Sequence, residues 1–204
     1  MLPVLEFYAN HTLNFENADI HKLEYDAISE LRTIEIPADI LNMVLDSIRL
    51  QFPGGDLSIF TEIDNWCPLS PPDIKGLPEI AKEHIVSLGP MGLRFVIRPD
   101  YIILPSIIYE PVDWYSPHNK EKVQLIRSYY HAVISLFGGD HALYVDTDIL
   151  NKYFPSKKKS DNAALISFEQ SLVKRYGTLE KKLYEYPHGE YPKYYIDHFT
   201  DIKN

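Results

Sequence analysis

A single cysteine, Cys67, occurs in this chain of 204 residues, so no disulfide bond can form within it. Long apolar runs are also missing: the longest, Tyr101–Tyr109, contains Pro105, whereas a membrane-spanning helix needs roughly 18 apolar residues. The first residues have no basic segment, and Glu6 interrupts their apolar stretch, which does not fit a secretory signal. We therefore expect a cytoplasmic protein without a membrane segment.

Basic side chains are scarce, with 20 lysines and arginines against 29 aspartates and glutamates and a formal charge of −9. Nucleic-acid backbones are bound by Lys and Arg side chains that neutralise phosphates, so we expect no nucleic-acid partner. The short run Lys157–Lys159 is interpreted as a solvated loop. The chain also lacks a phosphate loop, an HExxH motif and a serine nucleophile elbow. We therefore predict no cofactor, and no motif indicates a reaction.

The acidic excess lies in the first third of the chain. Residues 1–74 contain 13 carboxylates and three basic side chains, a net charge of −10. Such a surface can be a solvated face that keeps the protein soluble, or it can attract and steer a basic partner. A cation site is a third interpretation, although the carboxylates show no compact ligand spacing. We select as candidate partner-binding residues four that helical periodicity directs outward: Glu24, Glu30, Asp39 and Asp46.

The order of the expected elements predicts an α+β fold. Apolar residues recur at helical spacing in four segments, and alternation or apolar runs predict strands between them. The expected helices are 19–31, 37–52, 120–137 and 163–176, and the expected strands are 57–63, 84–88, 93–98, 101–109 and 141–145. Helices and strands do not alternate as in βαβ units, so we predict a mainly antiparallel sheet covered by about four helices. The sheet would comprise a three-strand meander plus one or two further strands.

One domain spanning residues 1–204 is the expected organisation, because this length can bury a sufficient core. The proline-rich stretch 67–78 is interpreted as a long surface loop. The tail 183–199 is rich in tyrosine, which is common at protein interfaces, but it can equally pack across its own domain. Gly-Gly-Asp occurs twice, at 54–56 and 138–140, and is interpreted as a helix-to-strand corner rather than as a duplication.

The triplet Asp146-Thr147-Asp148 follows a predicted strand. Two carboxylates at this spacing can share a hard cation such as Mg²⁺, which prefers oxygen ligands. The alternative is that Asp146 or Asp148 caps a short helix that begins there. We predict no metal, with Asp146 and Asp148 as the weak candidates.

A second candidate site is an anion pocket built from basic side chains. Arg94 and Arg98 share one face of a predicted strand, while Arg127 and His131 lie four residues apart on the polar stripe of a predicted helix. Together they could hold an anionic ligand. The alternative is that these side chains form salt bridges with the acidic excess.

A nucleophilic pair of Cys67 with His131 or His141 would need to assemble in space, because no motif joins these residues. We expect instead that Cys67 has no chemical role.

Three classes of function remain open. The first is a non-enzymatic cytoplasmic binding protein, possibly of the toxin-neutralising immunity type, that uses its acidic N-terminal surface against a basic protein partner. The second is an enzyme with a metal or anion site near Asp146 and Asp148 or near Arg94 and Arg127. The third is a structural or regulatory domain. The sequence favours the first class and leaves the oligomeric state open.

Overall fold

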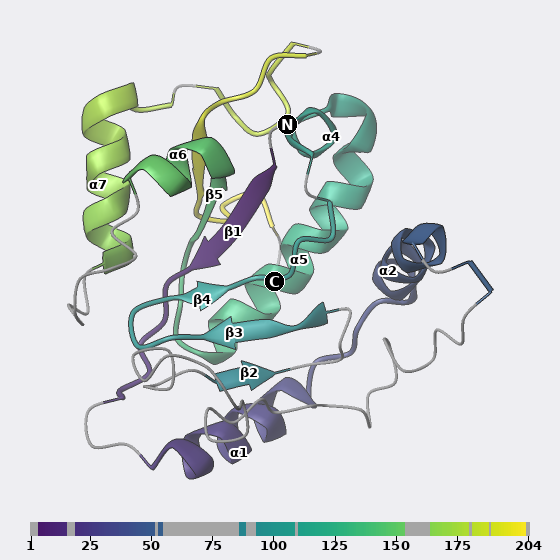
Figure 1. The fold of residues 1–204 in the computed structure, drawn as a ribbon, viewed down its shortest axis with the longest axis vertical. Helices are drawn as coiled ribbons and strands as arrows, with labels where there is room; N and C mark the ends of the chain where they lie inside the picture. The colour runs from purple at the N-terminus through teal and green to yellow at the C-terminus, as the bar shows by residue number, and fades with distance from the viewer. Residues whose placement is uncertain are drawn as a thin grey trace.

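The computed structural model describes residues 4–15, 19–51, 53–54, 86–88, 93–108, 110–153, 164–179, 181–187 and 189–202. The expected strand 57–63, the expected loop 67–78, Cys67 and Lys157–Lys159 lie outside these residues. Within the described residues a six-stranded sheet has the order β2-β3-β4-β1-β5-β6, with helices on both of its faces (Figure 1). Its pairings are antiparallel. The predicted α+β class is therefore confirmed.

The strands are β1 (Leu5–Ala9), β2 (Val86–Leu88), β3 (Phe95–Ile97), β4 (Ile102–Ile103), β5 (Ala142–Asp146) and β6 (Tyr194–Asp197). The longer helices are α1 (Ile20–Leu31), α2 (Ala38–Gln51), α5 (Lys120–Leu136) and α7 (Ala164–Tyr176). Shorter helical segments are α4 (Pro111–Trp114), the 3₁₀ turn η5 (Pro117–Asn119) and α6 (Thr147–Tyr153).

The expected meander is present as β2, β3 and β4. Leu93, Phe95 and Ile97 are buried on one face, as their alternation predicts. The third strand is much shorter than the expected 101–109, because Pro105 cannot donate to a ladder. The carbonyl of Pro105 instead accepts a hydrogen bond from the Tyr130 hydroxyl.

Strand β1 lies inside the sheet between β4 and β5 and separates two cores. Its residues alternate, so that Leu5, Phe7 and Ala9 point into a larger core under α5, α1 and α2. Tyr8 points to the other face, into a smaller core. Strand β5 is buried along its whole length because both faces are covered.

The larger core is built around aromatic rings. Trp114 is completely buried, and its ring makes edge contacts with Phe7 at 4.7 Å and with Tyr144 at 5.0 Å between centroids. Tyr130 of α5 stacks at 6.3 Å on Trp114. Aromatic pairs of this kind contribute about 0.5–1.5 kcal/mol each beyond the area they bury.

The smaller core lies under α6 and α7. Leu165, Phe168 and Leu172 recur at helical spacing on α7 and are buried against the sheet, as predicted. The same spacing predicts that Tyr176 points inward, but Tyr176, in the last turn, is 37% exposed, with its ring 6.4 Å from that of Tyr194 on β6. Gly177 ends the helix with a φ of 81°.

The second Gly-Gly-Asp segment joins α5 to β5. Gly138 has a φ of 72°, and the amide of Gly139 donates to the carbonyl of Ile134 at 3.0 Å. A side chain on Gly139 would collide with the backbone carbonyl of Asn10. The glycines therefore let α5 end directly against the chain that leaves β1, which supports the corner interpretation.

In the part of the chain that the structure describes, none of the helices combines the length and apolar character that crossing a bilayer requires.

Candidate functional site

A surface groove with a volume of about 490 Å³ lies between α1 and the end of α5. Carboxylates on α1 and just before it border the groove: Asp19, Asp26 and Glu30. Apolar side chains from three segments provide much of the rest of the lining: Leu13, Leu23, Ala27, Leu136 and Phe137. One cation, Lys22, also lines it. The groove therefore combines an acidic border with an apolar lining.

Helix periodicity explains this arrangement. The carboxylate of Asp19 accepts a hydrogen bond from the amide of Lys22 at 3.2 Å and so caps the start of α1. Asp26 and Glu30 are four residues apart and share one side of the helix. Ala27 is buried beside them, which fixes the rotation of the helix. Neither Asp26 nor Glu30 forms an ion pair within the described part of the chain.

The structure places the four sequence candidates on two helices. Glu30 lines the groove, whereas Asp39 and Asp46 are exposed on α2, none of whose described side chains belongs to the lining. Asp46 forms an exposed ion pair with Arg49 at 2.9 Å. Glu24 lies on α1, and its side chain is outside what is described. The expected outward position is thus present for Glu30, Asp39 and Asp46, and the groove also contains Asp26, which the sequence analysis does not name.

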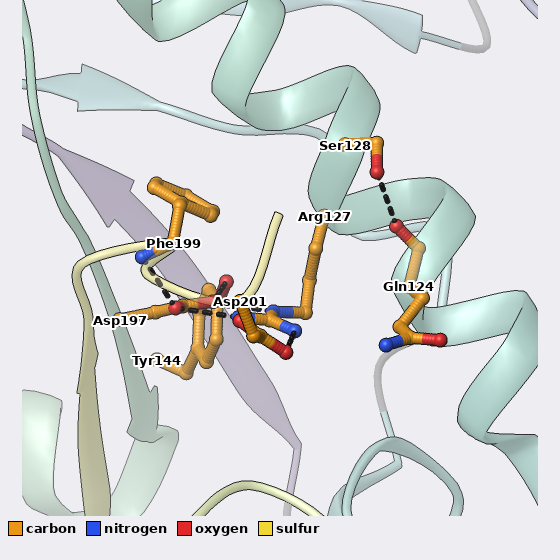
Figure 2. Close-up of polar contacts among 7 residues, drawn as sticks. All are labelled: Gln124, Arg127, Ser128, Tyr144, Asp197, Phe199 and Asp201. Atoms are coloured by element: carbon orange, nitrogen blue, oxygen red, sulfur yellow. Dashed lines mark hydrogen bonds and ion pairs between the residues drawn. The ribbon is translucent and has the colours of Figure 1, made fainter. Parts of the chain in front are cut away.

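Arg127 of α5 is almost completely buried and is the centre of a second polar cluster (Figure 2). Its guanidinium donates to both oxygens of Asp197, from Nε to Oδ2 at 2.6 Å and from Nη2 to Oδ1 at 2.8 Å. It also donates to Asp201, from Nη1 at 2.9 Å and from Nη2 at 2.7 Å. The Tyr144 hydroxyl and the Phe199 amide donate to Asp197 as well. The cluster is therefore satisfied by the chain itself.

The electrostatics of this cluster follow from burial. Burial lowers the pKa of Arg127, but its hydrogen bonds to Asp197 and Asp201 outweigh this and raise the pKa overall. Burial, followed by the charge of Asp197, raises the pKa of Tyr144 well above its usual range. The hydrogen bond from Arg127 lowers the pKa of Asp201. The two carboxylates give the cluster a net charge of about −1 at neutral pH.

Arg94 does not join Arg127, because the sheet lies between them. Phe95 and Ile97 point into the larger core with α5, so Arg94 and Arg98 project from the opposite face. The guanidinium of Arg98 lies 5.9 Å from the Tyr101 ring centroid. Arg127 forms salt bridges, which is the alternative interpretation given above, and the structure does not bring these residues together as an anion pocket. His131, the fourth candidate, packs against Phe199 at 5.0 Å.

Asp146 caps α6. Its Oδ1 accepts a hydrogen bond from the amide of Asp148 at 2.9 Å, which is the capping interaction considered in the sequence analysis. Asp146 is buried, and its second oxygen lies 3.5 Å from Nζ of Lys193, while Asp148 is exposed. Among the described residues, no group of three or more His, Cys, Asp or Glu side chains could hold a metal ion.

A third cluster, centred on His141, was not anticipated. Nδ1 lies 2.6 Å from Asp140, and Nε2 lies 3.1 Å from Glu169 of α7. Burial lowers the pKa of His141, but hydrogen bonds to Glu169 and Asp140 outweigh it and raise the pKa to about 9. Asn10 completes the cluster by donating to Asp140 at 2.8 Å. Protonated His141 thus connects α7 to the start of β5.

The sequence held a weak signal for this cluster. Glu169 follows Phe168 on the buried side of α7, where a carboxylate needs a partner. The sequence offers His141 only as a partner of Cys67, and because Cys67 lies outside the described residues, the absence of a chemical role for Cys67 stays a prediction.

Comparison with protein-family models, with curated proteins and with solved structures finds no match for this chain.

Proposed function

We propose that this chain is a non-enzymatic binding protein that engages a basic protein partner through its acidic N-terminal surface. The groove between α1 and α5 is the centre of the contact. The observation that carries the proposal is that the carboxylates of Asp19, Asp26 and Glu30 line one groove together with apolar side chains of α1 and α5.

A lysine or arginine side chain fits the chemistry of this groove. Its aliphatic stem can lie on apolar side chains such as Leu23 and Phe137, while its charged head stays near the border. Charge-assisted hydrogen bonds to Asp26 and Glu30 would then orient the head. The volume of about 490 Å³ is within the range of sites that enclose a small ligand or a few side chains.

The charge of the whole N-terminal third adds long-range attraction. Residues 1–74 carry a net charge of −10, and complementary potentials raise association rates more than they raise affinity. The exposed carboxylates of Asp39 and Asp46 on α2 belong to this wider field rather than to the groove.

Two further points refine the proposal. We place the encounter in the cytoplasm, because the single cysteine allows no disulfide within the chain, as is usual for proteins of a reducing compartment. We also propose that a basic toxin, neutralised by occlusion of its basic surface, is the class of partner. The enzymatic alternative has less support, because Arg127 and Asp146 are engaged within the fold.

The experiment is capture of partners by the tagged full-length chain from its native cell lysate, with identification by mass spectrometry. The test variant is Asp26→Lys with Glu30→Lys, and the matched control is Glu121→Lys with Glu190→Lys, which changes the same charge at exposed sites outside the groove. The proposal expects a basic protein that the test variant loses and the control retains. Equal retention by both variants would overturn the groove as the contact.

A further inference from the structure

Strand β6 forms one edge of the sheet. It pairs with β5 on one side, and within the described part of the chain no strand pairs with its other side. The amide of Asp146 donates to the carbonyl of Lys193, so the alternation of an antiparallel ladder directs the backbones of 193, 195 and 197 toward β5. The amides and carbonyls of Tyr194 and Ile196 therefore point outward, where another strand can pair with them.

An apolar groove of about 380 Å³ runs beside this edge, between β6 and α7. Ile166 and Val173 of α7 line it with Ile196, and they are 49% and 36% exposed. Ile166 and Val173 are seven residues apart, so they share one side of the helix. The outward backbone of β6 and this apolar side of α7 thus form one continuous surface.

We propose that this surface binds a second copy of the chain, with β6 of each copy paired antiparallel about a twofold axis. A twofold axis makes identical strands antiparallel, so one edge strand is complementary to itself. The axis passes beside Tyr195, and Tyr194 of each copy pairs with Ile196 of the other through about four backbone hydrogen bonds in all. The sheet then continues from one copy into the other, and the α7 helices pack across the axis.

The charges of Lys193 and Asp197 favour this strand register, in which Tyr195 lies on the twofold axis. With Tyr195 on the axis, Lys193 of one copy lies opposite Asp197 of the other, on the face that also carries Arg127. Opposite charges across a strand pair are favourable. Moving the axis to Ile196 would place Lys193 opposite Phe199 and lose this contact.

The first test is the molar mass of the full-length chain in solution, measured by sedimentation over a range of concentrations. We expect a dimer, with twice the 23.7 kDa of one chain. Val173→Lys places a charge in the groove and should give a monomer. Val112→Lys is the matched control, because Val112 on α4 is also 36% exposed and lies outside the groove. A monomeric wild type, or a dimer that persists in Val173→Lys, would overturn the proposal.

The second test addresses the strand edge itself. Ile196→Pro removes an outward amide and leaves the bonds between β5 and β6 intact, so a folded monomer is expected. Amide exchange gives a readout that needs no variant. The amide of Ile196 should become protected as the wild-type concentration rises, whereas that of Tyr195 should be protected throughout. Exchange at Ile196 that does not depend on concentration would contradict the dimer. Protection of Ile196 only after addition of a basic partner would assign this edge to that partner and overturn the proposal.

Discussion

Arg127 and Asp197 form a two-pronged ion pair inside the molecule, with hydrogen bonds of 2.6 and 2.8 Å between guanidinium and carboxylate. The pair connects the middle of α5 to the edge strand β6, 70 residues away in the chain. Asp201, which is half-exposed, closes over the same guanidinium. The C-terminal segment is therefore held to the core by charge as well as by apolar contacts.

Replacing Arg127 by Met should be strongly destabilising. The change leaves Asp197 buried without a cation, and breaking a buried pair by removing one partner costs about 3–5 kcal/mol. Urea denaturation measures this change in the free energy of unfolding. Asp201→Asn is the control and should cost under about 1 kcal/mol, because the lost charge is half-exposed. Adding Asp197→Asn to Arg127→Met should recover part of the loss, and no recovery would argue against an uncompensated charge as the cause.

The His141 cluster predicts a stability that falls at alkaline pH. The folded state raises the pKa of His141 from 6.5 to about 9, so its contribution is complete below about pH 6.5 and is lost as the pH rises through 9. Part of the pKa shift comes from Asp140, whose exposed charge is screened by water. We therefore expect the free energy of unfolding to fall by about 2 kcal/mol. Denaturation of the wild type and of His141→Gln at pH 6 and pH 9.5 measures it. Identical pH dependence in both proteins would show that His141 is not the group responsible.

Gly139 should tolerate alanine less well than Gly177, although only Gly177 has a positive φ. Alanine at Gly177 meets no neighbouring atom and should cost about 1 kcal/mol for its left-handed backbone. Alanine at Gly139 collides with the backbone carbonyl of Asn10 and should cost about 2–3 kcal/mol. Thermal unfolding compares the two, and the opposite ranking would contradict the close contact of the α5–β5 corner with β1.

Asp146 should act as a cap and not as a metal ligand. Asp146→Ala removes the acceptor of the Asp148 amide and should cost about 1–2 kcal/mol, whereas Asp148→Ala should cost little. A ligand that binds only the native state must raise the melting temperature. Millimolar Mg²⁺ or Mn²⁺ should therefore leave that temperature unchanged. A clear rise that Asp148→Ala abolishes would restore the metal interpretation.

The fold could be predicted where the pattern is local. The long apolar stripes of α5 and α7 and the alternation around β3 are properties of neighbouring residues, and their boundaries agree with the structure within a few positions. The sequence does not predict strands β1 and β6, because each is stabilised by pairing with β5, which is distant from both along the chain. That pairing joins segments as far apart as Asn10 and Asp140, 130 residues along the chain.

The candidate site could be predicted only in part for the same reason. The acidic character of α1 is visible in the sequence, and Glu30 was selected from it. The apolar wall of the groove comes from Leu136 and Phe137, which only the tertiary fold brings to α1. Likewise, nothing near Arg127 in the sequence indicates that Asp197 and Asp201 would neutralise it.

Binding of a basic partner through the acidic groove is tested by the association rate of the captured partner with the full-length chain, measured by stopped flow at increasing salt. Screening lengths shorten to about 10 Å at 0.1 M salt, so the rate should fall steeply through this range. Asp26→Lys with Glu30→Lys should slow association by about tenfold or more at low salt and flatten the salt dependence. The Glu121→Lys with Glu190→Lys control should keep a steep dependence. A test variant with the same association rate and salt dependence as the wild type would contradict binding through the acidic groove.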